Sequence, residues 1–546
     1  MSAIDNALKN NLAQAAQKAF DLQLSPDTIV IEIPKRKEQG DFSSNLAMQL
    51  ARTLHMKPRD IAEKLVENLD QSSLEKVEIA GPGFMNFTMS QDEYSSVLKN
   101  ILEKGSEYGQ LPPNGIKVDL EYVSANPTGS LHLGHARGAA WGDTIARIMK
   151  KAGYDVTREY YINDAGNQIH NLALSLWARY RQALGLEAEI GEGGYLGEDV
   201  KEMGAELAKE YGDRFVELTD ENLKFFREKG IKFELDKIKK DLARFRVEFD
   251  VWSSEQALRD SGAVEKALQV LEDNNKTYES EGALWFRTTD YDDDKDRVLR
   301  KTDGSYTYLV PDIAYHNNKY ERGFDKLVDF LGADHHGYIS RLKASMAALG
   351  NDPDKLDVDI IQMVRLVQDG EEVKMSKRLG NATTINELVD WVGVDAARYF
   401  FVARALDTHL DFDLGLAKSQ SADNPVYYAQ YAHARMCSVM RQAAEKGFKP
   451  ADHFELLTDE KEIDLIRQLQ EFENVIADAA RTRQAQKMTR YIQELAAKFH
   501  SFYTVCRVVD PDNPELSAQR LALVDASRIV MANALNSIGV DAVEAM

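Results

Sequence analysis

The chain has 546 residues, of which 44% are hydrophobic and 29% charged, the profile of a globular protein long enough for three or four domains. Its formal net charge is −22, from 67 Lys and Arg against 89 Asp and Glu, which excludes a surface coated in positive charge for non-specific nucleic-acid binding. No apolar run approaches the roughly 18 residues that span a bilayer. Cys437 and Cys506, the only cysteines, exclude a four-cysteine zinc site and suit a reducing compartment. We therefore expect a cytoplasmic protein without a membrane partner.

Residues 1–110 predict a small α+β domain. We expect an opening helix over 1–20 rather than a signal or transit peptide, followed by a strand over 28–33 that ends at Pro34. Helical patterns cover 42–54 and 58–69. Two short apolar strands, 77–80 and 84–89, flank the turn Gly81-Pro82-Gly83.

Residues 111–370 predict a Rossmann-type catalytic domain built on a doubly wound parallel sheet. After a linker over 111–115, strands are expected over 117–123, 156–161, 326–331 and 358–364. One helix is expected to begin near residue 132, and another to cover 340–349. Residues 185–300 predict an acidic, helical insertion, and its run Asp292-Asp293-Asp294 predicts a solvated loop. Residues 371–420 form a connecting region, and 421–546 predict an all-helical domain.

The string HLGH, from His132 to His135, follows the first predicted strand of this sheet. In a doubly wound sheet, ligands bind at the carboxyl ends of the strands, where the next helix N-terminus favours phosphate. His132 and His135 add hydrogen-bond donors, and Gly134 lets the backbone approach a nucleotide closely. Two histidines that cap an ordinary helix would give the same four residues.

A second string, KMSK, spans Lys374 to Lys377 after a late strand. It follows the turn Gln368-Asp369-Gly370 and precedes Gly380, so both lysines lie on a glycine-flanked loop. Such a loop can close over a triphosphate and stabilise the charge that develops as pyrophosphate leaves. A lone KxxK is more often plain surface. The two strings together, each after a strand, predict an enzyme that uses ATP to adenylate a carboxylate.

HLGH followed by KMSK resembles the class I aminoacyl-tRNA synthetases. Longer strings along nearly the whole chain resemble the bacterial arginyl-tRNA synthetase family. They are GDFSSNLA (40–47), EYVSANPTGSLHLGHARGA (121–139), EYYINDAGNQ (159–168), FDVW (249–252), DGSYTYLVPDIAYH (303–316), GADHHGY (332–338), VKMSKRLGN (373–381) and YAQYAHAR (428–435).

The resemblance implies a pocket for arginine, whose planar charged guanidinium is best held by carboxylates. By resemblance, Glu121, Tyr308 and Asp312 hold the side chain, and Asn126 and His335 the α-amino group. Asn163 and Asp164 are expected to line the same cavity. A structural role is the alternative in each case: Asn126 before Pro127 suits a turn, and Asp312 after Pro311 suits the first turn of a helix.

The resemblance also implies a two-step reaction. Arginine and ATP give arginyl-adenylate and pyrophosphate, and the arginyl group then passes to the 2′-hydroxyl of the terminal adenosine of the tRNA for arginine. His132, His135, Lys374 and Lys377 are expected to stabilise the transition state, and Gly134, Met375 and Ser376 to join them in binding ATP. Mg²⁺ accompanies ATP as part of the substrate; no prosthetic group, zinc or protein-held metal is expected. We expect a monomer.

The resemblance assigns anticodon binding to residues 421–546 and contact with the D-loop side of the tRNA to residues 1–110. Arg483, Lys487 and Arg490, spaced i, i+4, i+7, predict a basic helical stripe for tRNA, although a solvated helix face has the same pattern. Tyr427, with Tyr428 and Tyr431, could stack on bases, and a place in the core is the alternative.

Rival functions are weighed against the same residues. A non-catalytic synthetase paralogue that binds tRNA would be marked by loss of HLGH or KMSK, and both are intact. A small-molecule nucleotidyltransferase would need neither the N-terminal nor the C-terminal domain. A class I synthetase for cysteine is disfavoured because its zinc-type cysteines are absent from the sequence.

Overall fold

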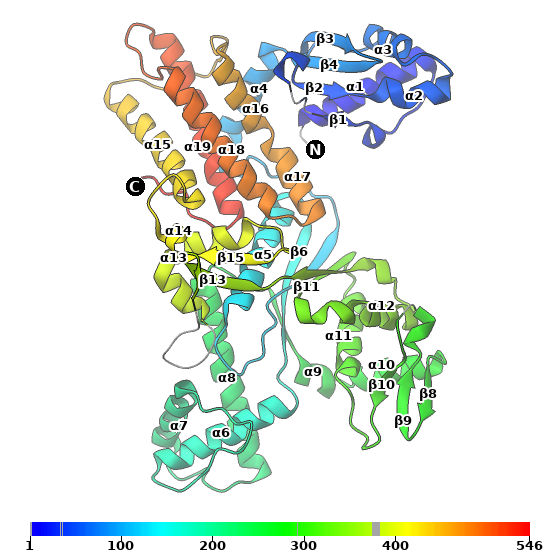
Figure 1. The fold of residues 1–546 in the computed structure, drawn as a ribbon, viewed down its shortest axis with the longest axis vertical. Coiled ribbons are helices and arrows are strands. Elements are labelled where there is room, and N and C mark those ends of the chain that lie inside the picture. The colour runs from blue at the N-terminus through cyan, green and yellow to red at the C-terminus, as the bar shows by residue number, and fades with distance from the viewer. Residues whose placement is uncertain (1–2, 33, 35, 292, 374–382) are drawn as a thin grey trace.

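The chain runs from a small α+β unit through a central parallel sheet to a bundle of long helices (Figure 1). This structure is a computed structural model that describes residues 3–32, 34, 36–291, 293–373 and 383–546, without the side chains of 3–6, 37 and 334–336. Among the described residues, no helix is both long and apolar enough to cross a membrane. The predicted α/β architecture with an all-helical C-terminal part is confirmed.

The N-terminal unit is a four-stranded antiparallel sheet, in the order β1-β2-β4-β3, with helices packed against it. Its elements are α1 (Ala3–Phe20), β1 (Ile31–Glu32), β2 (Phe42–Ser44), α2 (Leu46–Leu54), α3 (Pro58–Glu67), β3 (Leu74–Ala80) and β4 (Phe84–Met89), and α4 (Gln91–Lys104) leads out of it. The helix predicted over 42–54 is wrong at its start. Gly40, at φ +80°, brings the chain against the carbonyl of Phe87, so that Phe42 pairs with Phe87 as a strand.

The central sheet has five parallel strands in the order β12-β11-β5-β6-β7. Its strands are β5 (Lys117–Glu121), β6 (Asp155–Ile162), β7 (Val251–Ser254), β11 (Lys326–Gly332) and β12 (Leu356–Ile361), and helices α5 (Leu133–Lys151), α11 (Leu309–Glu321) and α12 (Ile339–Ala348) accompany them. The strand order reverses at β5, with β6 on one side and β11 on the other. Ligands of doubly wound sheets bind at the carboxyl ends of the strands beside such a switch point.

The insertion between β6 and β11 is only partly the helical segment that its sequence predicts. Its elements are α6 (Asn167–Ala183), α7 (Glu198–Tyr211), α8 (Asp220–Arg244), β7, α9 (Glu255–Asp260), α10 (Ala263–Asp273), β8 (Thr277–Ser280), β9 (Ala283–Phe286) and β10 (Arg297–Arg300). β7 extends the central sheet, and β8 to β10 form a separate antiparallel sheet. The solvated loop predicted at 292–294 is wrong for Asp293, which is 8% exposed because both its oxygens accept from Arg297 at 2.8 Å.

The remaining chain forms a small sheet and then the bundle. β13 (Val364–Gln368) pairs in parallel with β15 (Leu410–Asp413) and antiparallel with β14 (Glu371–Glu372), so the connecting region over 371–420 contributes two strands to this sheet. The helices are α13 (Ile385–Val402), α14 (Leu414–Lys418), α15 (Pro425–Glu445), α16 (Glu460–Gln470), α17 (Phe472–Thr482), α18 (Gln486–Val505) and α19 (Pro514–Ser537).

Helix α5 packs closely on the sheet because small residues face it. A Cβ at Gly142 would lie 2.2 Å from Cγ of Tyr122, whose side chain is fully buried, and a Cβ at Gly138 would lie 3.0 Å from Cδ1 of Ile361. Since cores are packed as densely as crystals, Tyr122 has no space into which to move. Glycine at 142 therefore sets how near the helix after HLGH lies to β5.

We predict that Gly142→Ala lowers the free energy of unfolding by about 1–3 kcal/mol or more, because the added methyl group overpacks Tyr122. Gly230→Ala is the control: its Cβ would lie 3.4 Å from Leu172, an ordinary contact in the middle of α8. That change is expected to be neutral or stabilising by up to about 1 kcal/mol. Thermal unfolding midpoints of both variants measure the difference, and equal midpoints would contradict the packing argument.

Candidate active site

HLGH forms the N-terminus of α5, directly beyond the carboxyl end of β5. His132 is the N-cap of the helix: its Nδ1 accepts from the Gly134 N–H at 3.2 Å, and its own N–H donates to Nδ1 of His135 at 3.3 Å. The two rings stack with centroids 3.8 Å apart. The alternative that these histidines cap a helix is therefore correct, and it does not compete with a role in phosphate binding.

The capping bonds also fix the protonation of both histidines. Each Nδ1 accepts a backbone N–H, so each neutral ring carries its proton on Nε2, which remains available as a donor. Burial lowers the pKa of His132, and burial together with His132 lowers the pKa of His135 to about 4. Both rings are consequently neutral donors at neutral pH, added to the positive end of the helix dipole.

KMSK (Lys374, Met375, Ser376 and Lys377) lies outside the described residues, but the chain on each side of it is described. Before it, the Val373 N–H donates to the Leu366 carbonyl at 2.9 Å, at the end of the β13–β14 hairpin. After it, Thr384 forms an antiparallel bridge with His132, and the Ile385 N–H donates to the Leu131 carbonyl at 2.9 Å. The segment that contains KMSK thus begins beside β13 and ends against HLGH.

The chain turns sharply between β5 and HLGH. Val123 has φ +70° and Ser124 φ +40°, and the Ser124 N–H donates to the Tyr122 carbonyl at 3.0 Å. A β-branched residue with positive φ is strained, and such strain tends to occur at functional sites. The turn places Ser124 Oγ 2.8 Å from Oε1 of Glu121, where it also accepts from the Tyr161 N–H.

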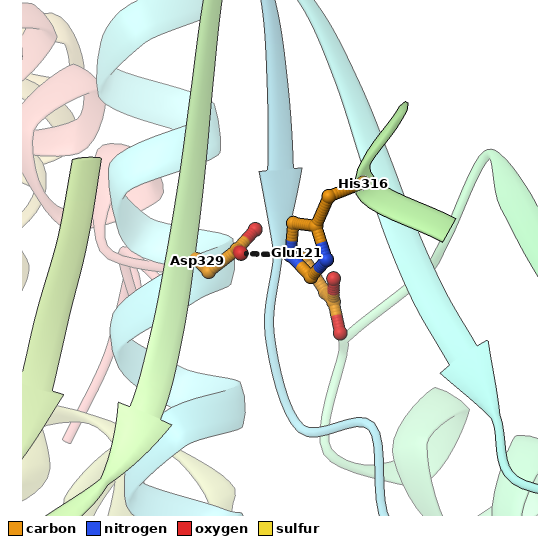
Figure 2. Close-up of side chains that lie close together, drawn as sticks. All are labelled: Glu121, His316 and Asp329. Atoms are coloured by element: carbon orange, nitrogen blue, oxygen red, sulfur yellow. Dashed lines mark hydrogen bonds and ion pairs between the residues drawn. The ribbon is translucent and has the colours of Figure 1, made fainter. Parts of the chain in front are cut away.

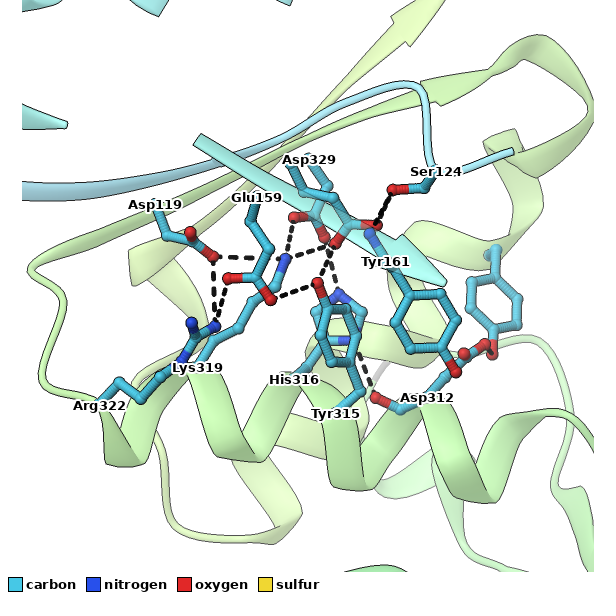
Figure 3. A network of polar contacts seen from close by, with 12 residues as sticks. Asp119, Ser124, Glu159, Tyr161, Asp312, Tyr315, His316, Lys319, Arg322 and Asp329 are labelled. Carbon is cyan, nitrogen blue, oxygen red and sulfur yellow. Dashed lines mark hydrogen bonds and ion pairs between the residues drawn. The ribbon is translucent and has the colours of Figure 1, made fainter. Parts of the chain in front are cut away.

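A row of carboxylates crosses the sheet beside this turn (Figure 3). Glu121 of β5 is in register with Asp329 of β11 on one side and with Glu159 of β6 on the other, so all three side chains lie on one face. Asp119 lies two residues earlier on the same face. All four residues are at least nine-tenths buried.

Helix α11 supplies the cations that this row requires. Lys319 is fully buried, and its Nζ lies 2.5 Å from Glu121 Oε2, 2.8 Å from Asp329 Oδ1 and 3.6 Å from Asp119 Oδ2. Burial alone would lower the pKa of Lys319, but the surrounding carboxylates outweigh it and hold the pKa well above its usual range. Arg322 pairs with Glu159 at 2.5 Å.

His316, also on α11, is held as an imidazolium by two acceptors. Its Nδ1 is 2.8 Å from the Asp312 carbonyl and its Nε2 is 2.7 Å from Asp329 Oδ2 (Figure 2). Neither partner can donate while Asp329 is ionised, so both ring nitrogens carry protons. Burial, which would lower the pKa of His316, is outweighed by Asp329, and the pKa is raised.

Glu121, His316 and Asp329 also form a possible metal-binding trio, because one ligand atom of each lies within 4.8 Å of the others. Lys319 already occupies the position of a cation there, bonded to both carboxylates. A metal ion would have to displace a buried ammonium from its ion pairs. We therefore assign the trio to the ion-pair network and not to a metal.

The network holds more negative than positive charge. Burial raises the pKa of Asp119 to about 8, so that this carboxyl is mostly neutral at pH 7. Burial also raises the pKa of Asp312 to about 6, and its Oδ2 accepts from the Tyr338 hydroxyl at 2.5 Å. Apart from Asp119, four carboxyl groups face three cations in this network, so its acidic side chains outnumber its basic ones; they are Glu121, Glu159, Asp312 and Asp329 against His316, Lys319 and Arg322.

The other residues predicted for arginine differ in position. Tyr308 is the N-cap of α11 and is 82% exposed, while Asp312 lies in the first turn of the same helix. Asn126, in the loop after β5, donates to Gln168 Oε1 at 2.8 Å, at the start of α6, the helix that follows β6. The side chain of His335 lies outside the described residues.

Asp164 and Asn163 follow the carboxyl end of β6. Both oxygens of Asp164 are taken by the start of α9, one by Ser254 Oγ at 2.6 Å and the other by the Gln256 N–H at 2.8 Å. These bonds favour a structural role for Asp164. Asn163 is half-buried beside it.

The α11 cations were missed from the sequence, and so were the acids that they neutralise, except Glu121. A helical pattern could have found them, because four polar residues of α11 share one face at spacings of three and four; they are Asp312, His316, Lys319 and Arg322. The acids are less visible: Asp119, Glu159 and Asp329 come from three strands, and only the strand order brings them together.

The basic stripe predicted in the C-terminal part is wrong for Arg483. This residue is the C-cap of α17, at φ +52°, and its guanidinium pairs with Asp359 at 2.6 Å and Asp357 at 3.0 Å. Lys487, on α18, pairs with Asp478. The side chain of Arg490 is 73% exposed and lies 3.7 Å from Glu494, so among these three it is best placed to contact a polyanion.

Two surface cavities of about 350 Å³ lie near these residues. Lys487 and Arg490 line the first together with Gln484, Gln486 and Gln493. Tyr427 lines the second, and its ring stacks at 6.3 Å on that of Tyr431, which is 41% exposed. Tyr427 and Tyr431 are therefore at the surface, whereas Tyr428 packs partly against the core.

Three family models match nearly the whole chain. Residues 6–89 match the arginyl tRNA synthetase N terminal domain, 97–402 the class I (R) tRNA synthetase catalytic domain, and 429–546 the DALR anticodon binding domain. The chain is 54% identical to the arginine–tRNA ligase of Bacillus subtilis, over 99% of each chain, and 56% identical to that of Bacillus cereus, over 100% of each. The arginyl-tRNA synthetase structure from Thermus thermophilus has a similar fold, with a TM-score of 0.77 at 21% identity over 100% of both chains.

We predict a pH-dependent contribution of His316 to stability. Because its pKa is raised on folding, the contribution is fully present below the unfolded pKa near 6.5 and is lost as the pH rises through the folded pKa. Asp329, Lys319, Glu121 and the Asp312 carboxylate face the ring. The loss of thermal midpoint caused by His316→Asn should therefore be larger at about pH 6 than at about pH 9.

His433→Asn is the matched control, since burial lowers the pKa of this histidine of α15. Its contribution should change in the opposite direction, falling as the pH is lowered. A cost of His316→Asn that does not depend on pH would contradict the imidazolium assignment.

Proposed function

The chain belongs to the arginyl-tRNA synthetases, the arginine–tRNA ligases of class I, and from this we propose how its residues carry out the reaction. The observation that supports the assignment most directly is the buried network at the β5 switch point. Its acidic side chains outnumber its cations beside the N-terminus of α5, so it suits a cationic amino acid next to the phosphates of ATP.

Asp312 is the proposed partner of the guanidinium. At pH 7 it is ionised but poorly stabilised, because burial has raised its pKa to about 6 and only Tyr338 donates to it among the described side chains. A guanidinium at fork geometry would replace that deficit with charge-assisted hydrogen bonds. Glu121 is proposed to act as a more distant negative charge, since it is bonded to Tyr315 and Lys319. Tyr308 and Asn126 are proposed to line the exposed side of the arginine site. His335 and Asn163 complete the proposed arginine site.

Adenylate formation is proposed to begin with attack of an arginine carboxylate oxygen on the α-phosphorus of ATP. The bond from that phosphorus to the bridging oxygen breaks, and pyrophosphate leaves with the electron pair. The Nε2–H groups of His132 and His135 donate to phosphate oxygens, and Gly134 permits close approach. Lys374 and Lys377 stabilise the leaving pyrophosphate, with Met375 and Ser376 in the same segment. Mg²⁺ enters with ATP as part of the substrate.

In the second step, the 2′-hydroxyl oxygen of the terminal adenosine of the tRNA attacks the arginyl carbonyl carbon. The bond between that carbon and the phosphate oxygen breaks, AMP leaves, and the hydroxyl proton is lost. No covalent enzyme intermediate is needed. The reaction is proposed to need the residues of one chain, as in a monomer. Two unpaired cysteines, Cys437 and Cys506, support a cytoplasmic setting.

Four regions are proposed to divide the work. Residues 1–110 contact the tRNA from one side, 111–370 carry the chemistry with an insertion over about 185–300, 371–420 close the site and meet the stem, and 421–546 bind the anticodon. Within the last region Arg490 and Tyr427 are proposed as tRNA contacts, since both are accessible. A non-catalytic paralogue is disfavoured because HLGH has intact donor geometry.

We predict that the protein catalyses pyrophosphate exchange with arginine and not with other standard amino acids. Exchange is measured with each amino acid in turn, with and without tRNA for arginine. Discrimination follows from the excess of acidic side chains, because a neutral ligand side chain would give Asp312 no charge-assisted partner beyond the imidazolium of His316. Exchange with another amino acid, or no exchange with arginine even when tRNA is present, would contradict the proposed arginine specificity.

A narrower prediction concerns Asp312. Asp312→Ala should raise the KM for arginine at least about tenfold, because one partner of a buried charged pair is removed, while ATP binding changes less than about twofold. Glu321→Gln is the control, since it removes an exposed carboxylate of the same helix whose partners are Lys266 at 2.9 Å and Asn317 at 3.3 Å, both outside the proposed site. Unchanged arginine kinetics in the Asp312 variant would remove this residue from the site.

A further inference from the structure

Arg137 is a fully buried arginine that no step of the proposed reaction uses. It lies on α5 two residues after His135, and its side chain is among the largest of the fully buried ones. Within the described chain, no carboxylate forms an ion pair with it. Burial lowers the pKa of Arg137 to about 10 although the charge of Asp407 acts to raise it, so the hydrogen bonds of the guanidinium must offset much of the cost of burying it.

All three of its hydrogen bonds go to backbone carbonyls of one small region. Nη1 donates to Gln362 at 2.8 Å and to Thr408 at 2.9 Å, and Nη2 donates to Ala405 at 2.8 Å. Gln362 comes two residues before β13, and Thr408 two residues before β15. The guanidinium therefore bonds to the chain just before β13 and just before β15, which are the two strands of a parallel pair.

That strand pair leads into KMSK. β13 runs from Val364 to Gln368, turns through β14, and reaches Val373 directly before Lys374. Beyond KMSK, Thr384 returns to His132 through a β-bridge. The described chain on both sides of KMSK is thus tied to α5, by the bridge of Thr384 to His132 after it and through the bonds of Arg137 to the start of the β13–β15 pair before it.

We propose that Arg137 is a positioning residue for adenylate formation, which sets the separation between the two ATP-binding motifs. At 1.5 Å of helix rise per residue, it lies only about 3 Å along the axis from His135. A forked guanidinium with several N–H donors can hold three carbonyls in fixed directions, whereas a lysine ammonium holds them less rigidly. This inference rests on the proposed function, since it assumes that HLGH and KMSK bind one ATP.

The test compares Arg137→Ala and Arg137→Lys with Arg147→Ala, a change on the same helix that removes bonds to Asp143 and to the Arg246 carbonyl. Pyrophosphate exchange is measured with arginine and tRNA present, together with the KM for arginine, the Kd for tRNA and the thermal midpoint. In Arg137→Ala we expect kcat to fall on the order of 10²-fold, as for a misplacement of about 1 Å, with the KM for arginine and the Kd for tRNA within about twofold. Arg137→Lys should fold, and its kcat should lie between those of Arg137→Ala and the wild type. The kcat of Arg147→Ala should equal that of the wild type.

Chemical rescue separates positioning from simple stabilisation. Methylguanidinium, added at saturating arginine, should restore part of the kcat of Arg137→Ala and leave the wild type and Arg147→Ala unchanged or slower. A kcat equal to that of the wild type, or a loss in Arg137→Ala without rescue and a similar loss in Arg147→Ala, would overturn the inference. If the wild type itself gave no exchange with arginine, the proposed function would fail instead, so the two failures are distinguishable.

Discussion

The burial of Lys319 among carboxylates is the interaction on which the active-site end of the sheet depends. Parallel strands lie about 4.8 Å apart, so the registered side chains Glu121, Glu159 and Asp329 would repel one another if all were ionised and unpaired. Lys319 bonds to two of them, and Arg322 bonds to the third. Removing one partner of a buried ion pair typically costs about 3–5 kcal/mol, so α11 cannot be separated from the sheet without loss. The helix that carries Asp312 is therefore fixed in place by the same ions that set the charge of the pocket.

This arrangement explains why the negative charge of the pocket is reserved for a ligand. Glu121 is engaged by Tyr315, Lys319 and Ser124, and it serves as a counter-charge instead of a free acceptor. Asp312 is the carboxylate closest to the exposed side, next to the open Tyr308. A neutral pocket would hold a guanidinium weakly, and one with several unbalanced carboxylates would take up protons, as Asp119 does. An excess of acidic side chains over cations is the state in which a cationic ligand completes the network.

The sequence was sufficient where the pattern is local. HLGH at a helix N-terminus, the alternating strands of the sheet and the helices of the C-terminal part follow from periodicity and short strings. The fold class was therefore predicted, and so was the place of Asp312 in the first turn of a helix, which its own string defines. The misses depend on distant pairing. Phe42 lies in a strand because it pairs with Phe87. Arg483 is not part of the expected basic stripe because it forms ion pairs with Asp357 and Asp359 of β12. Strand order places Glu159 beside Glu121, and no short string contains that order.

Helix α5 connects these local and distant constraints. Its first turn presents HLGH, Arg137 holds the strands that lead to KMSK, Gly142 fixes its distance from β5, and Asp143 pairs with the buried Arg398 of α13 at 2.6 Å. Arg398 in turn donates to the carbonyls of Phe245 and Ile538, at the ends of α8 and α19. Asp143 lies about 12 Å along the axis from His135. A shift of α5 along its axis would break the charge-assisted bonds of Arg137 to the β13–β15 region and that of Asp143 to Arg398 together, so the position of HLGH is set jointly by that region and by the helical bundle.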